Sequence, residues 1–160
     1  MTWTTFHHRG EVLRTVYDVL DTRRDGVLPM DLPGVLETFG SEHALLGALL
    51  LRWHTRLSGH LERVLSTQPM DTDQAVVDAW HATADDLPGI RAVLDHYRAE
   101  PTDEQMATTL ATSAAKEHLM LGALAGRHGA TPYDTAAAGR GLVERARTTY
   151  RPRRSGVAAA

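Results

Sequence analysis

Two glutamates, Glu42 and Glu117, interrupt stripes of apolar residues that are spaced three or four positions apart. That spacing predicts helices with one face in the core, so both carboxylates should point inward. A buried carboxylate must be paired, protonated or coordinated, because an unpaired one costs several kcal/mol. The two glutamates are therefore the first candidates for chemistry.

Histidines accompany both glutamates along the chain. His43 follows Glu42 and His118 follows Glu117. Inward Glu and His side chains in a helical core are the usual ligands of carboxylate-bridged metal sites. One hypothesis is thus a ferritin-like bundle that binds iron, manganese or zinc through Glu42, His43, Glu117 and His118. Further candidate ligands on this hypothesis are His54, His81 and His128.

The metal motif is incomplete in this chain. Di-metal bundles take a Glu-x-x-His pair from each of two helices, whereas Leu45 and Met120 stand where these histidines would be. Nearby arginines offer another partner for the carboxylates. A buried network of Glu, His and Arg explains both glutamates without any metal, and this is the leading interpretation. It requires no cofactor.

A cluster of side chains that favour binding lies at residues 52–56, Arg-Trp-His-Thr-Arg. Trp and Arg dominate interface hot spots, so the cluster predicts a binding site made of Arg52, Trp53, His54 and Arg56. The alternative places Trp53 in the core, with both arginines at its solvated edge. We expect a continuous helix through Trp53 and a mostly buried indole ring.

The segments around the two glutamates are near-copies of each other. Residues 42–49 read Glu-His-Ala-Leu-Leu-Gly-Ala-Leu and residues 117–124 read Glu-His-Leu-Met-Leu-Gly-Ala-Leu, so six of eight positions agree. Such a pair indicates an internal duplication. The pair resembles the duplicated motif of the Clp chaperone N-terminal domain, an all-α module of two repeats that docks substrates and adaptors. The resemblance covers these two short segments and implies a docking module.

Apolar residues recur at three- and four-residue steps through most of the chain, and no segment alternates as a strand does. This pattern predicts an all-α fold, a single-domain helical bundle of four to five main helices. Two long central helices should cover about 31–66 and 102–127, and Gly40 with Ser41 marks the one place where the first could kink or restart. The small residues Gly47 and Gly122 should let these two helices approach closely. The remaining helices should cover about 10–22, 72–85, 90–98 and 132–150.

The composition limits the class of protein. With 160 residues, of which 42% are hydrophobic and 23% charged, the chain predicts one domain over 1–150 and a flexible C-terminal tail over 151–160. A formal net charge of −3 excludes a strongly basic nucleic-acid-binding protein. No apolar run is long enough for a membrane span, and no secretion signal precedes the first helix, so we expect a cytoplasmic protein. The absence of cysteine excludes disulfide and thiolate chemistry.

Motifs of the common enzyme classes are missing from the sequence. It contains no Gly-x-Ser-x-Gly elbow, no Gly-rich phosphate loop and no dinucleotide fingerprint. The sequence therefore predicts a non-enzymatic helical bundle that acts through a protein partner or self-association, without nucleic acid or membrane. The metal-binding bundle and the Clp-like docking module are the alternatives.

Overall fold

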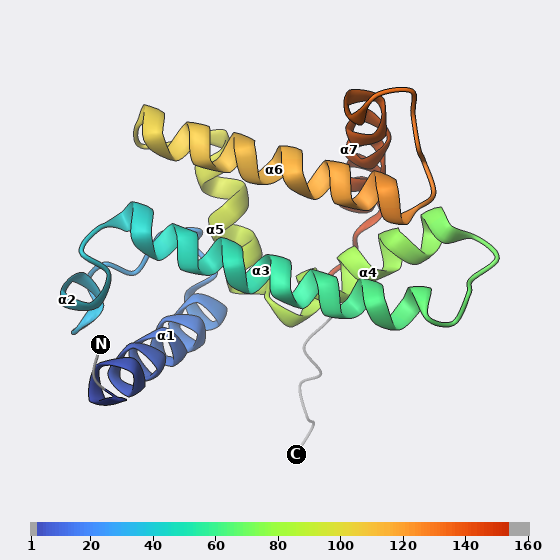
Figure 1. Ribbon diagram of the computed structural model, residues 1–160. Coiled ribbons are helices and arrows are strands. Elements are labelled where there is room, and N and C mark those ends of the chain that lie inside the picture. The colour runs from blue at the N-terminus through green and yellow to red at the C-terminus, as the bar shows by residue number, and fades with distance from the viewer. Residues whose placement is uncertain (1–2, 154–160) are drawn as a thin grey trace, which may run out of the picture. The chain divides into compact units, whose positions relative to one another are not determined.

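The computed structural model describes residues 3–153, and these form seven α-helices and no strand (Figure 1). The all-α prediction is confirmed, although seven helices take the place of the four to five expected. None of the described helices has both the length and the apolar composition that crossing a bilayer requires. The helices are α1 (Trp3–Arg23), α2 (Val35–Phe39), α3 (Glu42–Leu65), α4 (Thr72–Asp86), α5 (Pro88–Ala99), α6 (Glu104–Leu124) and α7 (Pro132–Thr149).

The described chain divides into two compact units. Unit 1 holds residues 3–56 and 87–115, and unit 2 holds residues 57–86 and 116–153. The boundaries fall inside α3 and α6, so each of these helices gives its first part to unit 1 and its last part to unit 2. One domain over 1–150 stays a prediction, and residues 154–160 of the predicted tail lie outside the described part.

In unit 1, α1 packs against α5 and α2. The end of α1 lies so close to the start of α5 that only glycine fits there, because a Cβ on Gly89 would be 2.3 Å from the carbonyl carbon of Leu20. The Gly89 N–H also donates to Asp21 Oδ1 at 3.0 Å. The hydroxyl of Tyr97 on α5 accepts a hydrogen bond from the Leu28 N–H at 3.2 Å. These contacts fix α5 against the chain that follows α1.

The first long helix predicted, over 31–66, is broken at Gly40. Gly40 has a φ of +76°, in the left-handed region that glycine adopts without strain, and its N–H donates to Leu36 O at 2.8 Å to close α2. The Ser41 hydroxyl then accepts from the Ala44 N–H at 3.1 Å and caps the start of α3. The expected helix over 31–66 is thus two helices, and the restart lies at Gly40 and Ser41, the one place where the sequence allowed it.

The other helix bounds differ less from those expected. The helix predicted over 102–127 is α6, over 104–124, and its cap is the Asp103 carboxylate, which accepts from the Met106 N–H at 2.7 Å. The helix predicted from residue 10 begins at Trp3. The Thr131 hydroxyl and the Asp134 carboxylate form a reciprocal capping box at the start of α7, where Pro132 occupies the first turn.

In unit 2, α4 packs against α7, and the last part of α6 approaches α7 backbone to backbone. A Cβ on Gly139 would lie 1.7 Å from the carbonyl oxygen of His118, and one on Gly122 would lie 2.0 Å from that of Thr135. Gly122 therefore serves a close helix approach, as expected of it, but its neighbour is α7. Gly47 serves no close helix approach, because a Cβ there would meet nothing within 4 Å.

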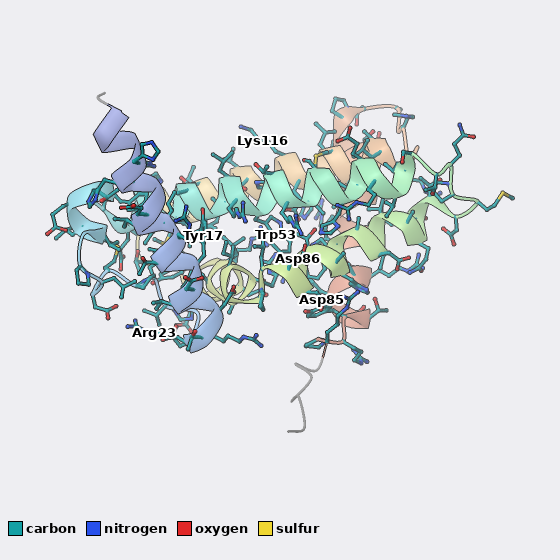
Figure 2. The ribbon with its side chains drawn as sticks, turned by 90° about the horizontal axis from the view of Figure 1, so that it is seen from below. Tyr17, Arg23, Trp53, Asp85, Asp86 and Lys116 are labelled. Atoms are coloured by element: carbon teal, nitrogen blue, oxygen red, sulfur yellow. The ribbon has the colours of Figure 1, made fainter. Side chains whose placement is uncertain are left out.

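The leucine-rich face of α3 supplies core side chains along the helix. Trp53 is fully buried in unit 1 (Figure 2), and the guanidinium carbon of Arg91 lies 4.6 Å from the centre of its ring. The helix is continuous through Trp53, so both expectations for this residue are confirmed. Buried residues that follow one another at steps of three and four along α3 are Leu46, Leu50, Trp53, Leu57 and Leu61.

Replacing the buried indole should be costly. Trp53→Ala should lower the free energy of unfolding by about 3–5 kcal/mol, because it removes a large aromatic ring from a packed core. Leu51→Ala is a matched control on the same helix, where the side chain is 69% exposed, and should cost less than about 1 kcal/mol. Urea denaturation of the three proteins measures both values. Equal losses for the two variants would contradict the burial of Trp53.

Candidate functional site

A surface groove of about 510 Å³ lies between α1 and α3 in unit 1. Its α1 residues are spaced four apart and its α3 residues three or four apart, so each helix contributes one face. The lining residues are Arg9, Leu13, Tyr17, Ala44, Gly47, Ala48, Leu51, Arg52 and Thr55.

The α3 wall of the groove is low and apolar. Ala44, Gly47 and Ala48 have little or no side chain, and the space beside Gly47 is open. Leu51 is 69% exposed, whereas Leu49 and Leu50 immediately before it are buried. An apolar side chain in contact with water loses the free energy that burial would provide, roughly 25 cal/mol for each Å². An apolar ligand that covers Leu51 would therefore gain binding free energy from the area that it buries.

Two arginines in the groove are seated on aromatic rings. The guanidinium carbon of Arg52 lies 5.3 Å from the centre of the Tyr17 ring, and that of Arg9 lies 4.5 Å from the centre of the Phe39 ring. No hydrogen bond or ion pair joins either guanidinium to another side chain in the described part of the chain. A guanidinium stacked on a ring face keeps its N–H groups directed outward at the edge. Both cations can therefore donate to a ligand.

The Tyr17 hydroxyl completes the polar part of the groove. Burial raises the pKa of this phenol above its ordinary value of 10.0, and the cations of Arg52 and Arg9 partly oppose that shift because they stabilise the phenolate. The hydroxyl is consequently protonated at neutral pH and can donate a hydrogen bond. Both arginines act electrostatically on this one group.

The structure separates the four residues predicted as a binding site. Arg52 lines the groove, while the ring of Trp53 is buried under Arg91. His54 is half-buried and Arg56 is exposed, and neither lines the groove. The predicted binding residues leave out the rest of the lining, including Leu51 on the same helix. They also leave out Arg9, Leu13 and Tyr17 on α1, because the periodicity of a helix shows which face is apolar and not which other helix it meets.

Two of the four candidate metal ligands belong to each unit. Glu42 and His43 belong to unit 1, and both are half-buried. His43 Nε2 lies 2.8 Å from the Thr109 hydroxyl, a hydrogen bond that ties α3 to α6 within the same unit. Glu117 and His118 belong to unit 2, where Glu117 is 2% exposed and His118 is half-buried. In residues 3–153 no three His, Asp or Glu side chains are grouped closely enough to hold a metal. The metal site gains no support and stays a prediction.

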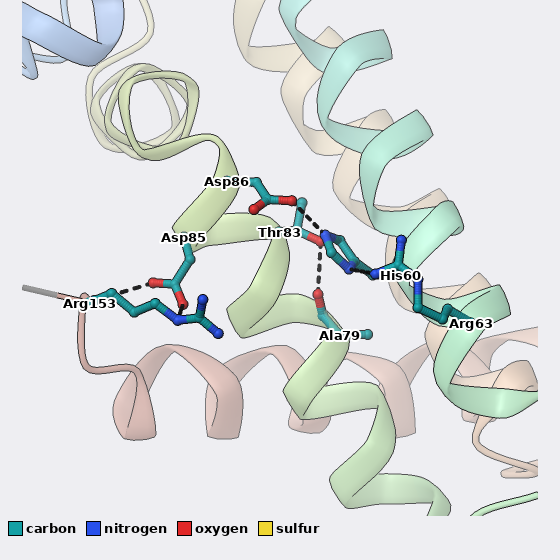
Figure 3. Close-up of polar contacts among 7 residues, drawn as sticks. All are labelled: His60, Arg63, Ala79, Thr83, Asp85, Asp86 and Arg153. Carbon is teal, nitrogen blue, oxygen red and sulfur yellow. Dashed lines mark hydrogen bonds and ion pairs between the residues drawn. The ribbon is translucent and has the colours of Figure 1, made fainter. Parts of the chain in front are cut away.

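A histidine–aspartate pair in unit 2 has the form of a catalytic dyad (Figure 3). His60 is buried on α3, and its Nε2 lies 2.8 Å from Asp86 Oδ2 on α4. Its Nδ1 lies 3.3 Å from Arg63, whose guanidinium only donates, so Nδ1 accepts and Nε2–H donates to the carboxylate. Both ring nitrogens are occupied, and none is left to take a proton from a substrate. The pair is a structural tie between α3 and α4.

A second carboxylate on α4 holds the segment after α7. Asp85 accepts from the Tyr150 hydroxyl at 3.0 Å and pairs with the Arg153 guanidinium at 3.1 Å, as Figure 3 shows for Arg153. The Arg153 N–H also donates to Asp85, at 3.3 Å. The described part of the predicted tail is thereby attached to α4 at Arg153.

Comparison of the chain with known protein families, with curated proteins and with solved structures gave no match. The resemblance to the Clp N-terminal domain therefore rests on the two short segments at residues 42–49 and 117–124 alone. What can be said of function comes from the groove and the polar clusters themselves.

The two glutamates should differ in their contribution to stability. Glu117→Gln should lower the free energy of unfolding by roughly 3 kcal/mol or more, because an amide cannot replace the contacts of a buried carboxylate. Glu42→Gln should cost less than about 1 kcal/mol, because this half-buried side chain lies in the first turn of α3, where the loss of its charge removes only a favourable interaction with the helix dipole. Melting curves with and without a chelator measure both effects. A loss that depends on the chelator would instead support the metal hypothesis.

The contact between Arg52 and Tyr17 can be tested by titration. Arg52→Gln should raise the pKa of Tyr17 further, because it removes the cation that most strongly opposes the effect of burial. Arg56→Gln, an exposed position on the same helix outside the groove, should leave that pKa unchanged. NMR titration of ring-labelled tyrosine gives the values. An unchanged Tyr17 pKa in Arg52→Gln would show that the guanidinium does not face the hydroxyl.

Proposed function

We propose that the protein is a non-enzymatic docking protein whose groove between α1 and α3 binds a helix of a partner protein. The observation that carries this proposal is Leu51, which is 69% exposed on a helix whose neighbouring leucines are buried. Beside it stand Tyr17 and Arg52, residue types that are enriched in the hot spots of protein interfaces.

The shape of the α3 wall favours a helix as the occupant. Ala44, Ala48, Leu51 and Thr55 follow one another at steps of three and four along α3, which makes a stripe of roughly 16 Å along the groove at 1.5 Å per residue. Small residues at the start of the stripe let another backbone come close, and Leu51 supplies the apolar anchor. An amphipathic helix that places its apolar face in a groove is a common mode of peptide recognition.

The chemistry of the lining supports binding over catalysis. The groove is lined by two arginines, one tyrosine and one threonine as its polar residues, and its lining contains no His, Asp or Glu. A site without these side chains lacks the usual general bases. Such a lining can orient a bound ligand and contribute to its affinity.

The proposal is tested by selection from a displayed library of helical peptides about 18 residues long. Peptides selected on the wild-type protein should bind Leu51→Glu at least tenfold more weakly, because a carboxylate replaces the apolar anchor. Leu36→Glu is the matched control, since Leu36 is 57% exposed on α2 in the same unit and does not line the groove. Its affinity for the same peptides should equal that of the wild type.

Two results would overturn the proposal. The first is a selection in which no peptide distinguishes Leu51→Glu from the wild type, although both fold equally well by circular dichroism. The second is a dimer, seen by sedimentation velocity in the wild type and lost in Leu51→Glu, which would assign the groove to a second copy of the chain.

A further inference from the structure

We infer that the partner helix carries an acidic side chain, which Arg52 and the Tyr17 hydroxyl receive in the groove while Arg9 adds positive potential. The inference rests on the proposed function and names the chemistry of the partner. It follows from the way in which the two groove arginines are held.

Several arginines of the described chain pair with carboxylates. Arg23 pairs with Asp31 at 2.8 Å, Arg153 pairs with Asp85 at 3.1 Å, and Arg127 pairs with Asp73. Arg127 and Arg23 hold the pKa of their partners below the ordinary range, because the guanidinium hydrogen bond stabilises the carboxylate. Each of these arginines thus pairs with a carboxylate of the same chain.

Arg9 and Arg52 are held differently. Each rests on an aromatic ring, and no described carboxylate pairs with either. The groove lining contains two positive charges and no negative one, although the whole chain has a formal net charge of −3. The groove is therefore positive by local arrangement, and a ligand that fills it gains by carrying a negative charge.

A carboxylate is the anion that fits this arrangement best. The edge of a guanidinium donates two parallel N–H bonds to a carboxylate, and stacking on a ring restricts the guanidinium before the ligand arrives. Tyr17, whose ring lies under Arg52 in the same groove, contributes a protonated hydroxyl. Two cations are too few for a nucleic acid, whose binding depends on neutralising many phosphates.

The charge of α7 argues that a partner protein, and not a second copy of the chain, occupies the groove. Ala137 and Gly141 on α7 form another exposed stripe of small residues that could lie against the α3 wall. Yet α7 carries Arg140, Arg145 and Arg147 against Asp134 and Glu144, all exposed, so the helix would bring a net positive charge to a positive groove. Like charges placed together at an interface are unfavourable.

The test is a double-mutant cycle between the protein and peptides selected as described above. The selected peptides should contain Asp or Glu, and its replacement by Asn or Gln should weaken binding to the wild type about tenfold. Arg52→Gln should weaken binding of the acidic peptide to the same degree and should bind the acidic and amide peptides equally. Arg56→Gln, exposed and outside the groove, should behave as the wild type does.

The outcomes separate this inference from the proposed function. Peptides that need Leu51 but carry no acid, or an Arg52→Gln variant that weakens both peptides equally, would overturn the inference and leave the docking function in place. An absence of any Leu51-dependent peptide would overturn both. A loss of affinity for the acidic peptide between 50 and 300 mM salt, without such a loss for the amide peptide, would support the inference.

Discussion

The burial of one face of α3 is the constraint on which the rest of the structure depends. Leu45, Leu46, Leu49 and Trp53 are each fully buried in unit 1, and their spacing fixes how the helix is rotated about its axis. That rotation turns Leu51 outward to the groove. Gly40 and Ser41 end one helix and begin another at Glu42. The rotation of α3 about its axis is therefore set by its own buried face and not by the preceding segment.

The sequence was sufficient for the fold class and for many local features. Three- and four-residue spacing predicts helices throughout. The start of α4, where the Asp71 carboxylate accepts from the Gln74 N–H, and the start of α7 at Pro132 follow from local hydrogen-bonding chemistry that adjacent residues determine. The break at Gly40 is harder to predict from the sequence, because a Gly–Ser pair inside an apolar pattern is compatible with a kink, a restart or a continuous helix. Packing of Val35 and Phe39, both buried, decides between them.

The candidate site was much less predictable. The sequence points to Arg52 because arginine beside tryptophan is typical of interfaces, but that tryptophan, Trp53, is buried in the core. The partner residues Arg9 and Tyr17 come from a helix about 35 positions earlier in the chain, and their contact depends on tertiary packing that periodicity does not encode. For the same reason Gly122 was correctly assigned to a close approach, while the helix that it meets, α7, was not foreseen.

The groove and the core are physically separate parts of unit 1. Surface side chains contribute little to stability, so Leu51 and the two ring-stacked arginines can change without unfolding the chain. Trp53, two residues after Leu51, faces the opposite direction and is fully buried. A stacked arginine retains the N–H groups that an intramolecular ion pair would consume, and an exposed leucine retains the area that a core would bury. Both features leave binding free energy available to a ligand, and they occur together on one groove.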